Sequence, residues 1–266
     1  MTATPLAAHA QPMLGSLVAG FVLLAAGLAA LAVRRQGSPL QTPQSTRRAL
    51  LYALVYGLCL ASFGRVLGGA LLGEERSPWL LALGDVIFVT LGLYVWVMVL
   101  AEGHDVRDYG LRPAKPARVM LTLLMGLGPV ALYSWGAYAT LWHQRVNVTS
   151  DTLVFALLFA SIGSALPDEM LFRGYMMSTL EGRASRWARV AVPALAFTVV
   201  RSLWMASALG LGSPAWLFYI FGVAFPMGLW WGLMRELAGG TIVPCLLSHF
   251  LLEFGPSLAG ASPAFP

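Results

Sequence analysis

The sequence predicts an all-α fold, a polytopic transmembrane helix bundle of about eight spans. Of its 266 residues, 58% are hydrophobic and only 11% are charged, a composition too apolar for a soluble domain of this length. Long apolar runs recur along the chain, and about 20 helical residues are enough to cross a hydrocarbon core of about 30 Å. The runs are continuous and do not alternate with polar residues, so we expect helices and not barrel strands.

Eight apolar segments are long enough to be spans. They lie near 13–33, 49–73, 79–101, 119–141, 152–172, 188–208, 215–234 and 241–259. The largest polar segments between them are 34–48 and 102–118, so we expect almost no body outside the membrane. We divide the chain into 1–104, which holds about three spans, and 105–266, which holds the others.

The positive net charge is explained by membrane topology, and we expect no nucleic-acid partner. Of the 17 Lys and Arg residues, twelve fall on one side of the predicted membrane, and only Arg76 and Arg145 fall on the other. The twelve are Arg34, Arg35, Arg47, Arg48, Arg107, Arg112, Lys115, Arg118, Arg183, Arg186, Arg189 and Arg235. Because positive charges mark the cytoplasmic side, we predict an integral protein of a bacterial inner (cell) membrane, in contact with membrane lipids and with both termini outside.

Ionisable residues cluster in the predicted spans of the second half. Such residues are costly inside a membrane and mark a functional site or an ion pair. The cluster consists of Asp168, Glu169, Arg173, Arg201, His249 and Glu253. Counted from the predicted cytoplasmic ends at about 1.5 Å per residue, they lie at comparable depths. We therefore expect three helices to present them in one polar layer.

The spacing within this cluster assigns partners. Glu169 and Arg173 are four residues apart with the acid first, the favourable order for an intrahelical pair, so Arg173 is predicted to be a structural partner of Glu169. Asp168 points about 100° away and is free to face another helix. His249 and Glu253 share a helix face. A carboxylate and an imidazole beside a water-accessible pocket form the minimum set for activating a water molecule.

These residues stand in motifs that resemble those of the CAAX-prenyl-protease and bacteriocin-processing family (CPBP, also called Abi), which are polytopic intramembrane endopeptidases. The family motif Glu-Glu-x-x-x-Arg, followed by Gly, is similar to Asp-Glu-Met-Leu-Phe-Arg-Gly at 168–174. The second motif, Phe-x-x-x-His, corresponds to 197–201, and the third, His-x-x-x-Asn or Asp, corresponds to 249–253. The Gly-Gly turn at 239–240 and Tyr-Gly-Leu-Arg at 109–112 also resemble the family, so the similarity covers roughly 105–255.

The resemblance implies a hydrolase that needs neither metal nor cofactor and cuts membrane-associated peptides or proteins. In the family, an acid of the first motif and the histidine of the second activate water, and the third motif stabilises the oxyanion. Here Asp168 replaces a Glu, Arg201 replaces a His and Glu253 replaces an Asn or Asp. Arg201 cannot be a general base, although it can hold a carboxylate or an oxyanion.

Two interpretations of these replacements remain open. In the first, Asp168 or Glu169 is the base of a protease, while Arg201 and His249 stabilise the oxyanion and the site opens toward the cytoplasmic half. In the second, Arg201 and Glu253 neutralise each other, and the chain is a catalytically inactive homologue that acts as a membrane binding or scaffold protein.

Two further functions are less favoured by the sequence. His249 and Glu253 could bind a metal together with an acid of the first motif, but an arginine at the same depth opposes a cation. A transporter is expected to have two halves related by inverted symmetry, which the sequence does not display. The nine Trp residues lie mostly near span ends or on packing faces, a pattern typical of an aromatic belt.

Overall fold

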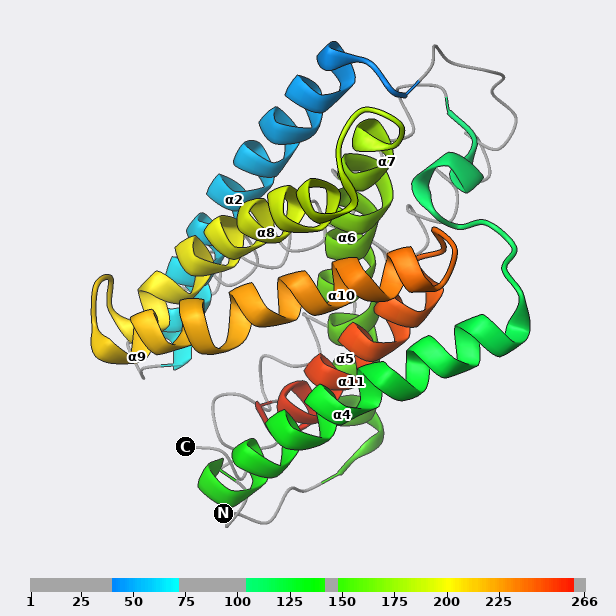
Figure 1. Ribbon diagram of the computed structural model, residues 1–266. Coiled ribbons are helices and arrows are strands. Elements are labelled where there is room, and N and C mark those ends of the chain that lie inside the picture. The colour runs from blue at the N-terminus through cyan, green and yellow to red at the C-terminus, as the bar shows by residue number, and fades with distance from the viewer. Residues whose placement is uncertain (1–39, 72–103, 142–147, 261–266) are drawn as a thin grey trace, which may run out of the picture.

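A computed structural model describes residues 40–71, 104–141 and 148–260, and the regular structure in these ranges is helical (Figure 1). The all-α prediction is therefore confirmed for the described residues. The predicted spans 13–33 and 79–101 lie outside these residues, as does most of 1–104. The proposed division of the chain near residue 104 stays a prediction.

The first two described helices correspond to predicted spans. Helix α2 covers Pro43–Leu71 and begins before the expected span 49–73. Helix α4 covers Pro116–Leu141 and corresponds to the expected span 119–141. A single 3-10 turn, η1, covers Val106–Tyr109 in the polar segment that precedes α4.

A long rod with two π-helical segments replaces the expected span 152–172. It consists of α5 Ser150–Leu158, the π-helical segment η2 Phe159–Ala165, α6 Leu166–Asp168, the π-helical segment η3 Glu169–Met176 and α7 Met177–Leu180. Gly174 lies inside η3 and does not interrupt the rod. The chain turns only after Leu180, near Gly182, whose φ of 71° favours glycine. Such π-helical segments occur frequently at functional sites.

Three more helical segments complete the described structure. Helix α8 covers Arg186–Leu209, and its N-cap Ser185 accepts a hydrogen bond from the amide of Ala188. The next segment consists of α9 Pro214–Phe218, the π-helical η4 Tyr219–Ala224 and α10 Phe225–Leu237. After the predicted turn at Gly239 and Gly240, both with positive φ, α11 covers Val243–Gly260.

Three described helices are long and apolar enough to cross a membrane. By length and composition, these spans are Pro116–Tyr133, Arg186–Ala206 and Pro214–Leu237, and Val243–Gly255 is a shorter apolar helix. Large apolar side chains such as Leu121 and Leu132 of α4 are exposed on the outside of the bundle. Such an apolar surface is expected to face lipid, and together with the three candidate spans it makes the chain an integral membrane protein. The count of about eight spans stays a prediction.

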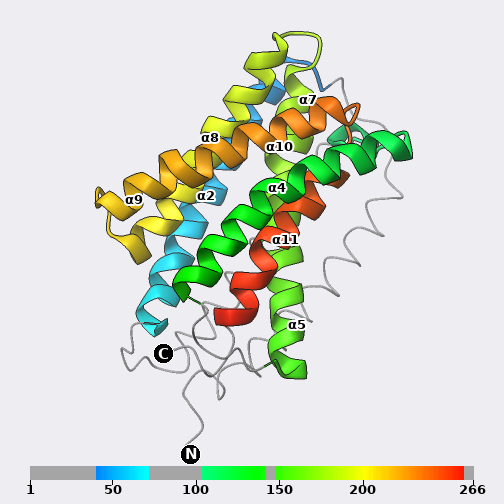
Figure 2. The same cartoon turned by 60° about the horizontal axis from the view of Figure 1, so that its bottom comes forward.

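Small residues allow α10 to pack closely on α8. A Cβ atom added at Gly228 would lie 3.1 Å from the Cβ of Ala194, and one added at Gly232 would lie 3.1 Å from a methyl group of Val190. Glycines spaced four apart allow such close contact between helices in membranes. On the other side of the bundle, α4 runs along α11 (Figure 2). These contacts bring α8, α10 and α11 around the rod that carries Asp168 and Glu169.

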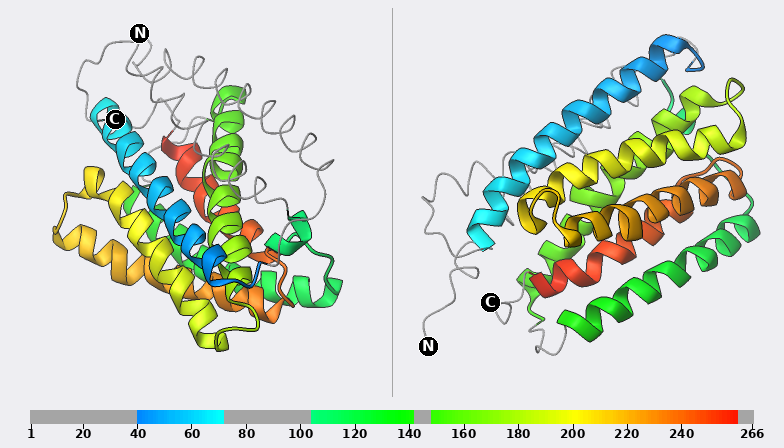
Figure 3. Two further views of the ribbon diagram at one scale, coloured as in Figure 1. Left: turned by 90° about the horizontal axis from the view of Figure 1, so that it is seen from above. Right: turned by 60° about the vertical axis from the view of Figure 1, so that its left-hand side comes forward.

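Several helix ends meet at one end of the bundle, which the charge distribution predicts to be cytoplasmic. The starts of α2, α4 and α8 and the end of α10 lie there (Figure 3, right). Ion pairs there connect the segment before α4, the turn after α7, the start of α8 and the end of α10. We call the residues that form them, Arg112, Glu181, Arg189, Arg235 and Glu236, the end network. Glu181 accepts from Arg112 at 3.2 Å and from Arg235 at 2.7 Å, while Glu236 pairs with Arg189 at 2.7 Å.

Candidate active site

The structure brings together all six side chains of the predicted polar layer, which are Asp168, Glu169, Arg173, Arg201, His249 and Glu253. Five of them are buried, and Glu253 keeps 21% of its side-chain surface exposed. They come from the α6–η3 rod, from α8 and from α11. The depth count along the helices therefore identified groups that contact one another, and this layer is the candidate active site.

Asp168 is held by Arg201. The Nε of Arg201 donates to Oδ2 of Asp168 at 2.8 Å, and its Nη2 also lies on that oxygen. Nη2 donates in addition to the hydroxyl of Ser164 in η2, a contact that the sequence did not indicate. Arg201 therefore binds the acid of the first motif more closely than it binds Glu253, which lies 3.4 Å from Nη2. The expected Arg201–Glu253 pair forms, but it is the secondary contact.

Glu169 is held by two donors on one oxygen. Its Oε1 accepts from Nη1 of Arg173 at 3.1 Å, as the spacing predicted, and it lies 2.9 Å from Nδ1 of His249. Because a carboxylate only accepts, Nδ1 of His249 carries the proton of this hydrogen bond. The other terminal nitrogen of Arg173, Nη2, donates to the carbonyl of Gly228 at 3.1 Å, which connects the rod to α10.

His249 lies at the centre of the layer. Its Nε2 is 3.2 Å from Nη2 of Arg201, 3.6 Å from Glu253 and 4.0 Å from Asp168. The imidazole therefore contacts Glu169 on one side and three charged groups on the other. Glu253 forms the exposed edge of this arrangement. The direction in which that edge opens across a membrane stays a prediction.

Two carboxylate oxygens of the layer are buried and unpaired. Among the described residues, Oδ1 of Asp168 and Oε2 of Glu169 are the buried carboxylate oxygens that have no hydrogen-bond partner. A buried unpaired acceptor is costly, at about 1–3 kcal/mol, and such atoms are uncommon in folded proteins unless they serve a function. Each oxygen is able to accept a proton or a hydrogen bond from a small molecule.

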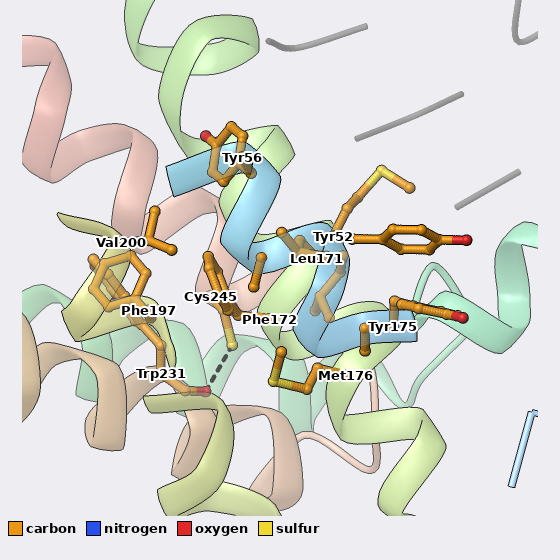
Figure 4. Close-up of a cluster of buried hydrophobic side chains, with 14 of the residues drawn as sticks. Tyr52, Tyr56, Leu171, Phe172, Tyr175, Met176, Phe197, Val200, Trp231 and Cys245 are labelled. Carbon is orange, nitrogen blue, oxygen red and sulfur yellow. Dashed lines mark hydrogen bonds between the residues drawn. The ribbon is translucent and has the colours of Figure 1, made fainter. Parts of the chain in front are cut away.

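Aromatic side chains enclose the layer on the side of α10. Phe197 and Trp231 belong to the buried cluster of Figure 4, and their rings meet edge to face with centroids 5.8 Å apart. The guanidinium carbon of Arg173 lies 4.5 Å from the centre of the Phe197 ring and 5.2 Å from that of Trp231. From the sequence, the Trp residues were expected at span ends or on packing faces. The only sequence feature that pointed to this contact was the position of Trp231 within the region that resembles the family.

The Tyr-Gly-Leu-Arg segment packs against η3, which carries most of the first motif. Tyr109 is fully buried, and its ring lies 5.7 Å from that of Tyr175 in η3. The carbonyl of Gly110 accepts from the amide of Ile242 at 2.9 Å. Gly174 lets η3 approach this segment, because a Cβ there would collide with the carbonyl of Tyr109. The segment thus connects the first motif to the turn before α11.

The metal site that His249 and Glu253 could form is opposed by the neighbouring Arg201. Within residues 40–71, 104–141 and 148–260, no three His, Cys, Asp or Glu side chains are grouped as ligands of a metal ion. The guanidinium of Arg201 lies among the acids that would be needed, and its positive charge opposes a cation at that position.

Comparison with known families agrees with the resemblance. Residues 150–255 match a family model described as Type II CAAX prenyl endopeptidase Rce1-like, which confirms the predicted resemblance to the CPBP family over this part of the chain. The match contains all three motifs and begins later than the expected residue 105. No curated protein and no solved structure matches the chain.

Proposed function

Because the part of the chain that builds the polar layer is similar to the Rce1-like endopeptidases, we propose that this protein is an intramembrane peptidase. It hydrolyses peptide bonds of membrane-associated peptides or proteins with a water molecule activated by a carboxylate. The observation that carries this proposal is the pair of buried, unpaired carboxylate oxygens beside His249 and Arg201.

In the proposed reaction, Asp168 is the general base and Glu169 is the second candidate. Arg201 holds Oδ2 of Asp168, and Oδ1 accepts a proton as water attacks the carbonyl carbon of the peptide. Carbonyl π electrons move onto oxygen, and the oxyanion is stabilised by Arg201 and His249. The intermediate then releases the amine, which takes the proton from Asp168 as the C–N bond breaks.

The charges of the layer are consistent with these roles. Its three carboxylates face two guanidiniums, so His249 in its protonated form brings the formal charge to zero. With Nδ1 donating to Glu169, the Nε2 of neutral His249 accepts from Nη2 of Arg201; once protonated, Nε2 becomes a donor and turns from Arg201 to the oxyanion. Arg173 serves as the structural partner of Glu169, and Glu253 lies at the exposed edge, where a substrate can approach.

The Arg201–Asp168 contact also favours a second function. A guanidinium that occupies one oxygen of the acid fits an inactive homologue, in which the layer only joins helices and the chain acts as a binding or scaffold protein. The two functions differ in whether membranes that carry this chain acquire new protein termini.

The test compares membranes that contain the intact chain with membranes that contain the combined variant Asp168→Ala/Glu169→Ala/His249→Ala. New N- and C-termini are quantified by mass spectrometry, and Arg183→Ala, at an exposed position, serves as the control. Cleavage products that occur with the intact chain and with Arg183→Ala, but not with the combined variant, support a peptidase. Identical termini in all membranes, with the variants folded, would leave the scaffold function.

A further inference from the structure

Trp231 lies beside the polar layer although it carries no charge. It is among the largest fully buried side chains of the described residues. Its indole stacks on the imidazole of His249, with ring centroids 4.2 Å apart and planes 18° from parallel. The same indole lies 5.2 Å from the guanidinium carbon of Arg173. Trp231 thus contacts both of the groups that donate to Oε1 of Glu169.

The indole is itself fixed by contacts with two other helices. Its Nε1 donates to the hydroxyl of Ser248 at 3.1 Å, and that hydroxyl donates to the carbonyl of Gly126 in α4 at 3.2 Å. The carbonyl of Trp231 accepts from the thiol of Cys245 at 3.1 Å (Figure 4). Rotation of the indole would break its hydrogen bond to Ser248 of α11, whose hydroxyl is itself held by α4, so this hydrogen bond fixes the ring plane.

The stacking constrains how His249 can be oriented. The imidazole has Nδ1 at 2.9 Å from Glu169 and Nε2 at 3.2 Å from Arg201. If the ring turned about its bond to Cβ, both contacts would be lost, since the two nitrogens lie on opposite sides of the layer. A flat indole against the imidazole face opposes that turn. It also favours a positively charged ring through its π electrons.

We infer that Trp231 is a positioning residue of the proposed peptidase, which holds the His249 ring so that Nδ1 faces Glu169 and Nε2 faces Arg201. The expected effect of Trp231 on catalysis rests on the proposed function. Its expected effect on the orientation of the imidazole does not. A misplacement of about 1 Å in a catalytic group can lower a rate about 10²-fold. Loss of the stacked ring therefore reduces turnover more than substrate binding.

The first test observes the imidazole directly. The full-length chain is labelled with ¹⁵N at histidine, reconstituted in lipid nanodiscs and studied by NMR, and the signals of His249 are assigned with His249→Ala. The intact chain is expected to give one set of ring nitrogen signals. Trp231→Leu is expected to shift or split them, Trp231→Phe to retain most of the original pattern, and the neighbouring Trp230→Leu to leave it unchanged.

The second test measures peptide cleavage by the same samples. Trp231→Leu is expected to lower kcat about 10- to 100-fold with KM changed less than about 3-fold, and Trp231→Phe is expected to recover most of the loss. Ser248→Ala removes the anchor of Nε1 and keeps the ring, so it gives a smaller effect in the same direction. If Trp231→Leu does not fold, Ser248→Ala still tests whether a fixed indole is needed for cleavage.

The outcomes separate the two proposals. Altered His249 signals without any cleavage by the intact chain would refute the peptidase and retain the positioning role. Unaltered His249 signals in Trp231→Leu and Ser248→Ala would overturn the positioning role, whatever the activity. Equal losses of kcat in Trp230→Leu and Trp231→Leu would also overturn it, because the effect would then reflect packing of α10 in general.

Discussion

Two groups of ion pairs lie in the same bundle, and they differ in how deeply their carboxylates are buried and how fully these are paired. In the end network, Glu181 lies between Arg112 and Arg235, and its side chain keeps 31% of its surface exposed. In the polar layer, Asp168 and Glu169 are completely buried. Each of these two acids uses one oxygen for its arginine and leaves the other without a partner among the described residues.

The difference indicates what each group is for. An ion pair that only joins helix ends can remain near water, where desolvation is small and solvent satisfies the remaining lone pairs. A fully buried acid must have a specific partner for its charge, and an unpaired oxygen next to it adds to the cost without adding stability. The fully buried acids of the polar layer therefore have the properties expected of a reactive site, and the partly exposed acids of the end network have those of a structural one.

The largest predicted effect is on stability at Arg173. Arg173→Met keeps most of the volume but removes the buried cation next to Glu169, and we expect the free energy of unfolding to fall by about 3–5 kcal/mol. Titration with SDS in mixed micelles measures this change. The matched control, Arg183→Met, replaces an exposed arginine and is expected to change the free energy by no more than about 0.5 kcal/mol. Equal effects of the two substitutions would contradict the distinction.

An intermediate effect on stability is expected at Gly174, where the polar layer meets the segment that leads to the end network. Gly174→Ala places a methyl group against the carbonyl of Tyr109, in the segment that also carries Arg112. We expect a loss of about 1–3 kcal/mol of stability from overpacking. Gly128→Ala is the control, since its Cβ would meet nothing within 4 Å. That substitution is expected to be neutral or stabilising by about 0.5–1 kcal/mol. A harmless Gly174→Ala would show that the close approach of η3 to this segment is not required.

The smallest predicted effect is in the end network. Arg112→Met removes the partly exposed pair with Glu181, while Arg235 stays on the same carboxylate. We expect the free energy of unfolding to fall by only about 0.2–1 kcal/mol, and the difference to decrease further at high salt. If Arg112→Met were as destabilising as Arg173→Met, the end network would have to be regarded as part of the buried site.

The convergence of the site could be predicted from the sequence, because it depends on depth and periodicity. Asp168, Arg201 and His249 lie at similar distances along their helices from the predicted cytoplasmic ends, and the four-residue spacing pairs Glu169 with Arg173. The helical fold followed from composition and continuous apolar runs. Both inferences use properties of single helices, which do not depend on how the helices rotate against one another.

The partners across helices could not be predicted in the same way. Arg201 faces both Asp168 and Glu253, and the choice between them depends on helix rotation. The π-helical segments around Asp168 change the angle per residue, so the geometry of an ideal helix does not say which neighbouring helix each side chain faces. Trp231 resembled any other apolar residue of a membrane span until α10 was placed against α11.

The most direct test measures hydrolysis by the purified full-length chain in liposomes. Its substrate is a membrane-anchored peptide with a prenylated C-terminal segment, chosen because of the family match. We compare the intact chain with Asp168→Asn in the polar layer and Glu181→Gln in the end network, at equal amounts of folded protein. The account predicts cleavage by the intact chain and by Glu181→Gln, and a rate for Asp168→Asn that is roughly 10²–10⁴-fold lower. Equal rates for Asp168→Asn and the intact chain would contradict the claim that the buried carboxylates activate water.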